Sequence, residues 1–369
     1  MLDHPAQHFS PAFREVQLSA LLEPTVFYWS TGEGRFHDPG FGREVRWDID
    51  LLSGYRWWAP SLRAGRFAAA LATIRRLEVA DPYLLICFGW ATAIARLALA
   101  WALGRSRWVL LYGDSTWQHE RGGFGGLARS ALLRTLFGQV DGALSTGAFN
   151  REFYIRHHMH PERIRNGVCP ADVELYAAAR LVNRRGPAGT LVVGFAGKLI
   201  PRKGAHELLA ALALLPSGSC VALVAGEGSE RHRLKALARE LNIEDEVSFV
   251  GFVNQSEMPA FLASCDIVVV PSTLDMRVLV VIEAMAAGAA VVVSSATAVW
   301  GCGDLIEHGE TGLVYRSGDP GDLAGCLRSL IADQGRLRAL ADAGTARVGG
   351  FGPAAFRTHL EAAVASRLH

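Results

Sequence analysis

The sequence has no excess of charge of either sign and no long apolar run. Its 37 lysine and arginine residues balance 36 acidic residues, for a formal net charge of +1. This balance argues against a nucleic-acid-binding protein that relies on a strongly basic surface. The most apolar helical segment, about Ala91–Leu103, contains Arg96 and is too short to span a bilayer. The polar first nine residues do not resemble a signal peptide, so we expect a soluble, cytoplasmic protein.

Cysteine is sparse, and its six occurrences are scattered with no C-x-x-C pair and no His–Cys cluster. This spacing indicates neither a zinc site nor a disulfide framework, and it is typical of a reducing compartment. His157, His158 and His160 are near neighbours, but only positions three or four apart share one face of a helix. We therefore interpret the three histidines as an exposed helix end, and we predict no metal site.

Lysine is scarce, since only Lys198, Lys203 and Lys235 occur among the 37 basic residues. Two of the three lie five residues apart in one glycine-flanked loop. A lysine ammonium acts as a compact point charge on phosphate, which is a reason to use lysine where the rest of the chain uses arginine. Chance clustering is the other explanation, and the sequence leaves both open.

Short apolar segments alternate with helical segments along the chain. Such alternation predicts an α/β protein with a Rossmann-like, doubly wound parallel sheet in each half. A polar stretch around residues 184–187 separates the two series. We expect an N-terminal domain over residues 1–175, a linker over residues 176–190, a C-terminal domain over residues 191–348 and a separate helix over residues 349–369.

The N-terminal series has no visible first strand. A doubly wound sheet normally opens with an apolar strand, whereas residues 4–16 predict a loop and then a helix. We expect either a sheet that lacks its first strand, with a gap or an exposed edge, or a chain that begins late.

A βαβ unit over Cys265–Ser295 carries two acids, Asp275 in its loop and Glu283 on its helix. The apolar runs on either side are typical of strands buried on both faces of a parallel sheet. Ligands of such sheets bind at the carboxyl ends of the strands, beside helix N-termini. Glu283 lies in an otherwise apolar helix, where an unpaired charge costs on the order of several kcal/mol. A salt-bridged structural helix is the alternative to a ligand site.

Two further loops follow apolar strands in the same half. Gly197–Gly204 carries Lys198, Arg202 and Lys203, whose charges can neutralise a diphosphate, and Gly226–Gly228 allows close approach of a ligand to the backbone. Cations for phosphate, glycines for close approach and acids for hydroxyl groups together indicate a nucleotide-sugar site.

The motifs of the second half resemble the retaining glycosyltransferases of family four. That family has the GT-B fold, which is two Rossmann-like domains with an interdomain cleft and a C-terminal helix that packs back on the first domain. The resemblance covers roughly residues 190–345, and extends loosely to residues 47–55, the Gly113–Ser115 loop and Pro170–Glu174, which resemble members from bacterial polysaccharide and glycoconjugate pathways. The matching segments are Gly194–Lys198, Lys203–Gly204, Gly226–Gly228, Val250–Phe252, Pro271–Ser272, Glu283–Gly288, Asp304–Leu305 and His308–Val314.

The resemblance implies roles for the charged residues. Lys198 and Lys203 would bind the phosphates of a UDP-, GDP- or ADP-sugar and stabilise the leaving nucleoside diphosphate. Asp275 would face the donor sugar, and Glu283 would hold the ribose hydroxyl groups. The family typically needs no metal and no cofactor. The acceptor would be a glycan, a lipid-linked glycan or a natural product.

Other residues of the expected site follow from the same resemblance. The backbone at Leu279 and Val280 would contact the sugar or the phosphate. Asp114, in a loop of the other half, is the candidate there for contact with the donor sugar or the acceptor. Independently of the resemblance, the arginines at 121, 129 and 134 on and beside the helix Leu127–Phe137 suggest weak peripheral contact with a membrane, and a solvated helix face is the alternative. The remaining donor-binding candidates are Gly197, Gly226, Glu227 and Gly228.

Three positions in the segment from Asp275 to Glu283 differ from the family pattern. Asp275 stands where most members have glutamate, and Arg277 and Val278 replace an aromatic residue and a glycine. A β-branched valine restricts the backbone where glycine would let amides approach the sugar. Two alternatives therefore stand beside an active transferase: a catalytically degenerate GT-B protein that binds a nucleotide or a partner, and a nucleotide-sugar epimerase.

Overall fold

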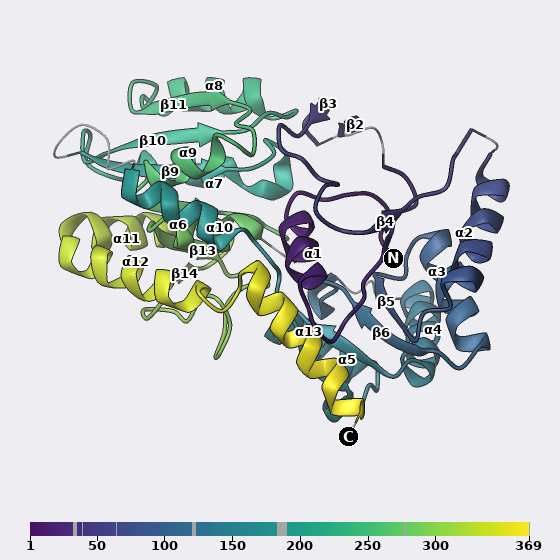
Figure 1. The fold of residues 1–369 in the computed structure, drawn as a ribbon. Helices are drawn as coiled ribbons and strands as arrows, with labels where there is room; N and C mark the ends of the chain where they lie inside the picture. Colours follow the sequence, from purple (N-terminus) through teal and green to yellow (C-terminus); the bar gives the residue numbers. More distant parts are fainter. Residues whose placement is uncertain are drawn as a thin grey trace. The chain divides into compact units, whose positions relative to one another are not determined.

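The computed structural model describes the chain except for residues 32–34, 39, 64, 120–122, 183–189, 277 and 369. The chain divides into two compact units. Unit 1 comprises Met1–Gly34, Asp50–Pro170 and Pro353–His369, and unit 2 comprises Arg35–Ile49 and Ala171–Gly352. Each unit contains a parallel sheet with helices packed against it, so the predicted α/β architecture is confirmed (Figure 1).

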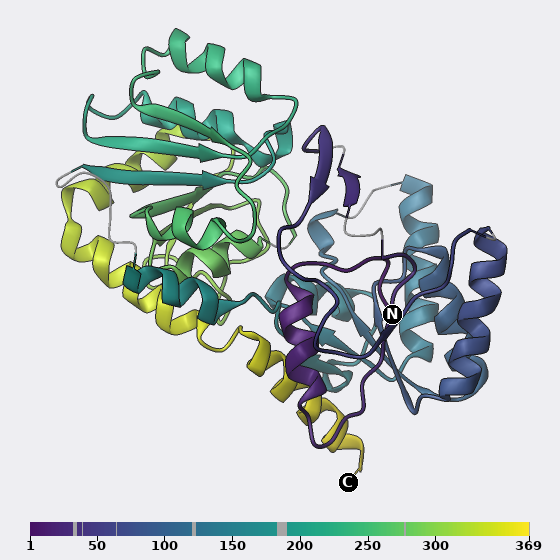
Figure 2. The same ribbon diagram turned by 45° about the horizontal axis from the view of Figure 1, so that its top comes forward.

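The sheet of unit 2 has six parallel strands in the spatial order β11-β10-β9-β12-β13-β14, among the residues that the structure describes. Helices lie on both of its faces (Figure 2). The chain first winds outward from β9 through β10 to β11, then returns to the other side of β9 and winds through β12 to β14. The winding therefore reverses between β9 and β12, the position where doubly wound sheets bind their ligands. The strands are β9 (Leu191–Ala196), β10 (Cys220–Ala225), β11 (Val247–Gly251), β12 (Ile267–Val270), β13 (Ala290–Ser294) and β14 (Leu313–Tyr315).

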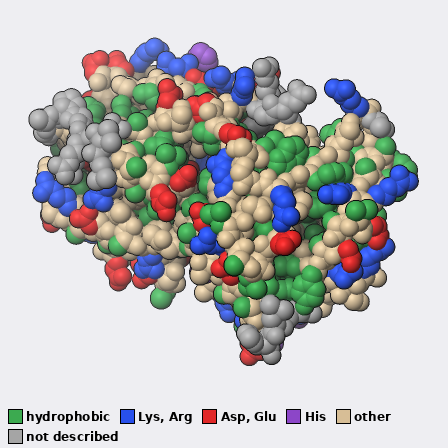
Figure 3. Space-filling model, viewed as in Figure 1, with side chains coloured by type: hydrophobic (Ala, Val, Ile, Leu, Met, Phe, Trp, Pro, Cys, Tyr) green, Lys and Arg blue, Asp and Glu red, His purple; other side chains and the backbone are tan. Residues whose placement is uncertain are grey.

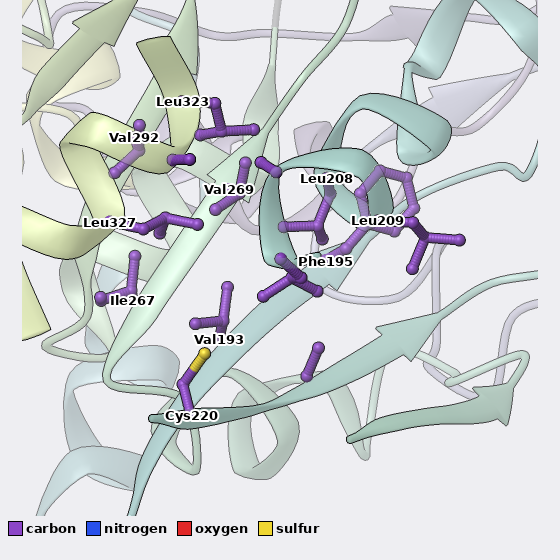
Figure 4. Close-up of a cluster of buried hydrophobic side chains, with 14 of the residues drawn as sticks. Val193, Phe195, Leu208, Leu209, Cys220, Ile267, Val269, Val292, Leu323 and Leu327 are labelled. Carbon is purple, nitrogen blue, oxygen red and sulfur yellow. The ribbon is translucent and has the colours of Figure 1, made fainter. Parts of the chain in front are cut away.

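The core of unit 2 forms because these strands are apolar along their whole length. All four residues of β12 and all five of β13 are buried. Leucines of the covering helices pack onto this sheet, among them Leu208 from α7 and Leu323 from α11 (Figure 4). The helices of unit 2 are α6 (Val173–Val182), α7 (Ala205–Leu212), α8 (Arg231–Glu240), α9 (Met258–Ala263), α10 (Leu279–Ala286), α11 (Pro320–Ala332) and α12 (Gln334–Val348).

Unit 1 contains a parallel sheet in the order β5-β6-β7-β8 and a separate parallel pair, β1 and β4. Its strands are β1 (Val26–Phe27), β4 (Trp57–Trp58), β5 (Leu84–Phe88), β6 (Trp108–Tyr112), β7 (Gly142–Ser145) and β8 (Ile164–Asn166). Its helices are α1 (Phe9–Gln17), α2 (Arg66–Ala80), α3 (Ala93–Gly104), α4 (Gly123–Gln139), α5 (Ala148–Arg156) and α13 (Pro353–Leu368).

The expectation of a missing first strand needs correction. The amide of Leu2 donates to the carbonyl of Phe27 at 2.9 Å, and the amino group of Met1 donates to the carbonyl of Ile86 at 2.9 Å. The amide of Phe88 in turn donates to the carbonyl of Met1 at 3.1 Å. Residues 1–3 thus run between β1 and β5 and occupy the place of the first strand. Two apolar residues followed by Asp3 are too short a segment to give a strand pattern in the sequence.

The two units differ from the expected domains in two places. Helix α6, part of which was expected to be linker, packs against α9 and α10 in unit 2. The antiparallel hairpin of β2 (Arg35–Asp38) and β3 (Arg43–Arg46) also belongs to unit 2, although its sequence lies in the first half of the chain. Helix α13 belongs to unit 1, where it packs against α1. The interdomain cleft stays a prediction.

Candidate active site

The loops after β9 and β10 lie against each other at the carboxyl ends of the two strands. The amide of Gly197 donates to the carbonyl of Ala225 at 3.0 Å, and the amide of Leu199 donates to the carbonyl of Glu227 at 2.8 Å. Gly226 has a φ of +141°, and a Cβ there would lie 1.8 Å from the carbonyl oxygen of Gly197. The sequence suggested that glycine leaves room for a ligand here. The structure shows that glycine is also required for the contact between the two loops.

Asp275 joins the loop after β12 to the loop after β9. Its side chain is only 9% exposed, forms an ion pair with Lys203 and accepts a hydrogen bond from the hydroxyl of Ser272 at 3.1 Å. A guanidinium nitrogen of Arg202 lies 3.9 Å from the same carboxylate. The structure therefore brings Lys203 and Asp275 together at the point where the winding of the sheet reverses.

Lys198 faces an acid that the sequence did not single out. Its Nζ atom donates to Oδ2 of Asp38, at the end of β2, at 2.7 Å. Burial favours the neutral form of Asp38, but the hydrogen bonds from Lys198 and from the amide of Gly40 outweigh it, so the pKa of Asp38 lies below its ordinary value. Asp38 lies in a polar, glycine-rich stretch that gives no strand or site pattern, so its place beside Lys198 could not be predicted.

Glu283 lies on α10, among the buried apolar side chains of that helix. Burial raises the pKa of Glu283 to about 7, against the opposing effect of a hydrogen bond from the hydroxyl of Tyr176. Tyr176 belongs to α6 and is 2% exposed. Its hydroxyl is the polar group that the half-buried acid was expected to need. Tyr176 was not predicted as this partner, because the expected boundary between the first domain and the linker divides α6.

The other donor-site candidates of unit 2 lie around the same strand ends. Leu279 and Val280 are the first two residues of α10, directly after the loop of Asp275. Val278, which replaces the glycine of the family pattern, is 4% exposed and has a φ of −108°, an ordinary value for valine. Arg277 lies outside the described residues.

Asp114 belongs to unit 1, in the loop after β6, and its side chain is exposed. It is not part of the cluster within unit 2, and its role stays a prediction. Among the described residues, no group of three or more His, Cys, Asp or Glu side chains could hold a metal ion. In the same part of the chain, no helix combines the length and the apolar character needed to cross a bilayer.

The charges of this cluster form two ion pairs, Lys198 with Asp38 and Lys203 with Asp275. Each ammonium has three hydrogen-bond donors, so it can bind an anion in addition to its carboxylate or in place of it. The arrangement can therefore receive a diphosphate next to a carboxylate that accepts hydrogen bonds from hydroxyl groups.

Solved structures with the same fold are GT-B glycosyltransferases. HepE of Anabaena, solved in complex with UDP, matches with a TM-score of 0.74 at 18% sequence identity, over 99% of both chains. Sucrose-phosphate synthase from Thermosynechococcus elongatus matches with a TM-score of 0.69 at 21% identity, over 100% of this chain and 98% of the other. At these identities the similarity establishes the fold, and the chain has the GT-B fold.

Residues 183–347 match the family described as Glycosyl transferases group 1. A glycogen synthase of Mycobacterium tuberculosis is 34% identical over 172 residues, which are 46% of this chain and 39% of the synthase. A D-inositol 3-phosphate glycosyltransferase of Stackebrandtia nassauensis is 36% identical over 166 residues, 42% of this chain and 37% of that protein. The chain thus spans less than half the length of these two relatives.

Proposed function

We propose that this protein transfers a sugar from a nucleoside-diphosphate donor to a carbohydrate, lipid-linked or natural-product acceptor, with retention of the anomeric configuration and without a metal ion. Lys198, Lys203 and Asp275 at the strand ends of unit 2, with Glu283 on the following helix α10, carry this proposal. The match of residues 183–347 to the family described as Glycosyl transferases group 1 supports it.

The two lysines would stabilise the leaving group, which is the nucleoside diphosphate. As the bond between the sugar and the diphosphate breaks, negative charge grows on the phosphate oxygens, and a fixed ammonium stabilises that charge in the transition state. Lys203 is well placed to do so because Asp275 and the turn at Pro201–Lys203 fix its position. Asp275 would accept hydrogen bonds from hydroxyl groups of the donor sugar, and Glu283 from those of the ribose.

UDP-sugars are the first donors to test, because HepE was solved with UDP and with UDP-glucose. The experiment is a thermal-shift and hydrolysis screen of UDP-, GDP- and ADP-sugars in the presence of EDTA. A ligand at one hundred times its dissociation constant adds about 2.7 kcal/mol of stability, which such a screen detects. We expect stabilisation by one nucleotide series together with slow release of the sugar. No response to any donor from the folded protein would contradict the proposal.

The products of the screen also separate the two alternatives. The buried Val278 in place of glycine favours a degenerate protein, which would bind a nucleotide without turnover even when acceptors are added. An epimerase would instead change the configuration of the sugar. Retention is tested directly by determining the anomer formed on an acceptor.

We also propose that α4 of unit 1 contacts an anionic lipid surface. Leu127 and Leu132 are 71% and 66% exposed, and α4 carries Arg129 and Arg134 but no acidic residue. Basic, acidic and hydrophobic side chains are interspersed on the face that Figure 3 shows, so this view gives no patch of one charge. Arg121 lies outside the described residues.

A further inference from the structure

The hairpin of β2 and β3 lies on the candidate donor site of unit 2. Its residues pair antiparallel from Arg35 with Arg46 to Asp38 with Arg43. Asp38 at the turn accepts hydrogen bonds from the amides of Gly40 and Phe41, at 2.8 and 3.2 Å, through Oδ1. Its other oxygen, Oδ2, remains for the ammonium of Lys198. The turn thus holds a carboxylate in place on a lysine assigned to phosphate binding.

The turn also contacts the second glycine loop. A Cβ on Gly228 would lie 2.9 Å from the carbonyl oxygen of Gly40, and a Cβ on Gly40 would lie 2.6 Å from Cδ of Lys198. The ring of Phe41 lies under the Lys198 ammonium, with Nζ 5.2 Å from the ring centroid. Residues 38, 40 and 41 therefore lie against both loops that are expected to bind the diphosphate.

The other end of the hairpin is attached to the loop after β11. The side-chain amide of Asn254 donates to the carbonyl of Arg46 at 3.0 Å, and the amide of Ser256 donates to Asp48 at 3.1 Å. The rings of Phe41 and Phe252 meet edge to face with centroids 5.2 Å apart. The hairpin is held at two points on unit 2, and one of them is an ion pair with a candidate phosphate-binding residue.

We propose that residues 35–48 form a strap over the donor site and that the Asp38 carboxylate competes with the donor's phosphate groups for Lys198. This inference rests on the proposed function and adds Asp38 to it, as a residue that lowers the affinity for the donor. A diphosphate carries more negative charge than one carboxylate, so it displaces Asp38 when bound. Its affinity is lowered by the ion pair that must first be broken. Binding of the donor therefore loosens the contacts of Asp38 with Gly40 and Phe41.

The test compares the wild type with Asp38→Asn and Asp48→Asn in titrations with UDP and inorganic pyrophosphate. Asparagine keeps an oxygen for the amides of Gly40 and Phe41 but removes the charge that faces Lys198. We expect Asp38→Asn to bind both probes about two- to fivefold more tightly, the range of a partly exposed ion pair. Asp48→Asn makes the same change at the far end of the strap and is expected to bind like the wild type.

Hydrogen exchange without any nucleotide gives a second readout. The amides of Gly40 and Phe41 should exchange faster in Asp38→Asn than in the wild type, because the turn loses its ion pair to Lys198. Equal or weaker binding of UDP by Asp38→Asn, or an equal gain in Asp48→Asn, would overturn the strap and leave the donor site standing. If neither the wild type nor Asp38→Asn binds UDP, GDP, ADP or pyrophosphate, the proposed function fails and the strap with it.

Discussion

Glu283 is the one acid of the apolar helix α10, and its carboxylate accepts a hydrogen bond from the hydroxyl of Tyr176 on α6. A lone acid in an apolar helix could be recognised from the sequence, because burial of an unpaired charge is costly. Its partner, Tyr176, could not be recognised from the sequence. It lies more than one hundred positions before Glu283, on a helix that the expected boundary between the first domain and the linker divides. The same holds for Lys203 and Asp275. Each was predicted to be a residue of the site, but the ion pair between them was not predicted.

The raised pKa of Glu283 predicts a dependence of stability on pH. A carboxyl with a pKa of about 7 in the folded state and 4.5 in the unfolded state binds more protons when folded between these values. The contribution of Glu283 to the free energy of unfolding is therefore greatest below pH 4.5 and is lost as the pH rises to 7. Urea unfolding of the wild type and Glu283→Gln at pH 5 and pH 8 measures it.

We expect the free energy of unfolding of the wild type to fall relative to that of Glu283→Gln as the pH rises from 5 to 8. The reason is that Glu283 ionises over this range and glutamine does not. Glu244→Gln is the matched control, since Glu244 is exposed. The same difference between wild type and Glu283→Gln at both pH values would mean that Glu283 titrates normally.

At the scale of elements, the strands and helices of unit 2 were largely predictable, because apolar strands and amphipathic helices alternate with clear glycine stops. Two elements were not. The β2–β3 hairpin contains glycine, proline and charged residues, and its position depends on contacts with Lys198 and Ser256 that no local pattern encodes. The two-residue segment that replaces the first strand was too short to recognise.

The prediction at the scale of elements is that helix α4 binds an anionic lipid surface. Leu127 and Leu132 are exposed on a helix that bears arginine and no acid, so the protein should sediment with vesicles that contain phosphatidylglycerol more than with phosphatidylcholine alone. Replacing both leucines with glutamine should reduce this binding. Leu214→Gln is a control, because Leu214 is 53% exposed in unit 2. Equal sedimentation with both kinds of vesicle would contradict a contact with anionic lipid.

At the scale of the whole molecule, the sequence predicted two α/β halves but not which segments each contains. Residues 35–49 belong to unit 2 and α13 to unit 1, so the chain passes between the units more often than its linear order suggests. Periodicity reports which side of an element is buried, not which distant sheet buries it. The donor, the acceptor and the arrangement of the two units lie beyond what such patterns contain.

The most direct test of the donor site is a calorimetric titration of the wild type, Lys203→Ala and Lys235→Ala with UDP in EDTA. Loss of a charged contact with phosphate weakens binding by about 10- to 100-fold. Lys235 on α8 is the matched lysine outside the strand-end loops. Because Lys203→Ala leaves Asp275 without its partner, Lys203→Gln serves as a second variant, and thermal unfolding checks that each protein is folded. We expect weak binding by both Lys203 variants and wild-type affinity for Lys235→Ala. Wild-type affinity in folded Lys203→Ala and Lys203→Gln would contradict it.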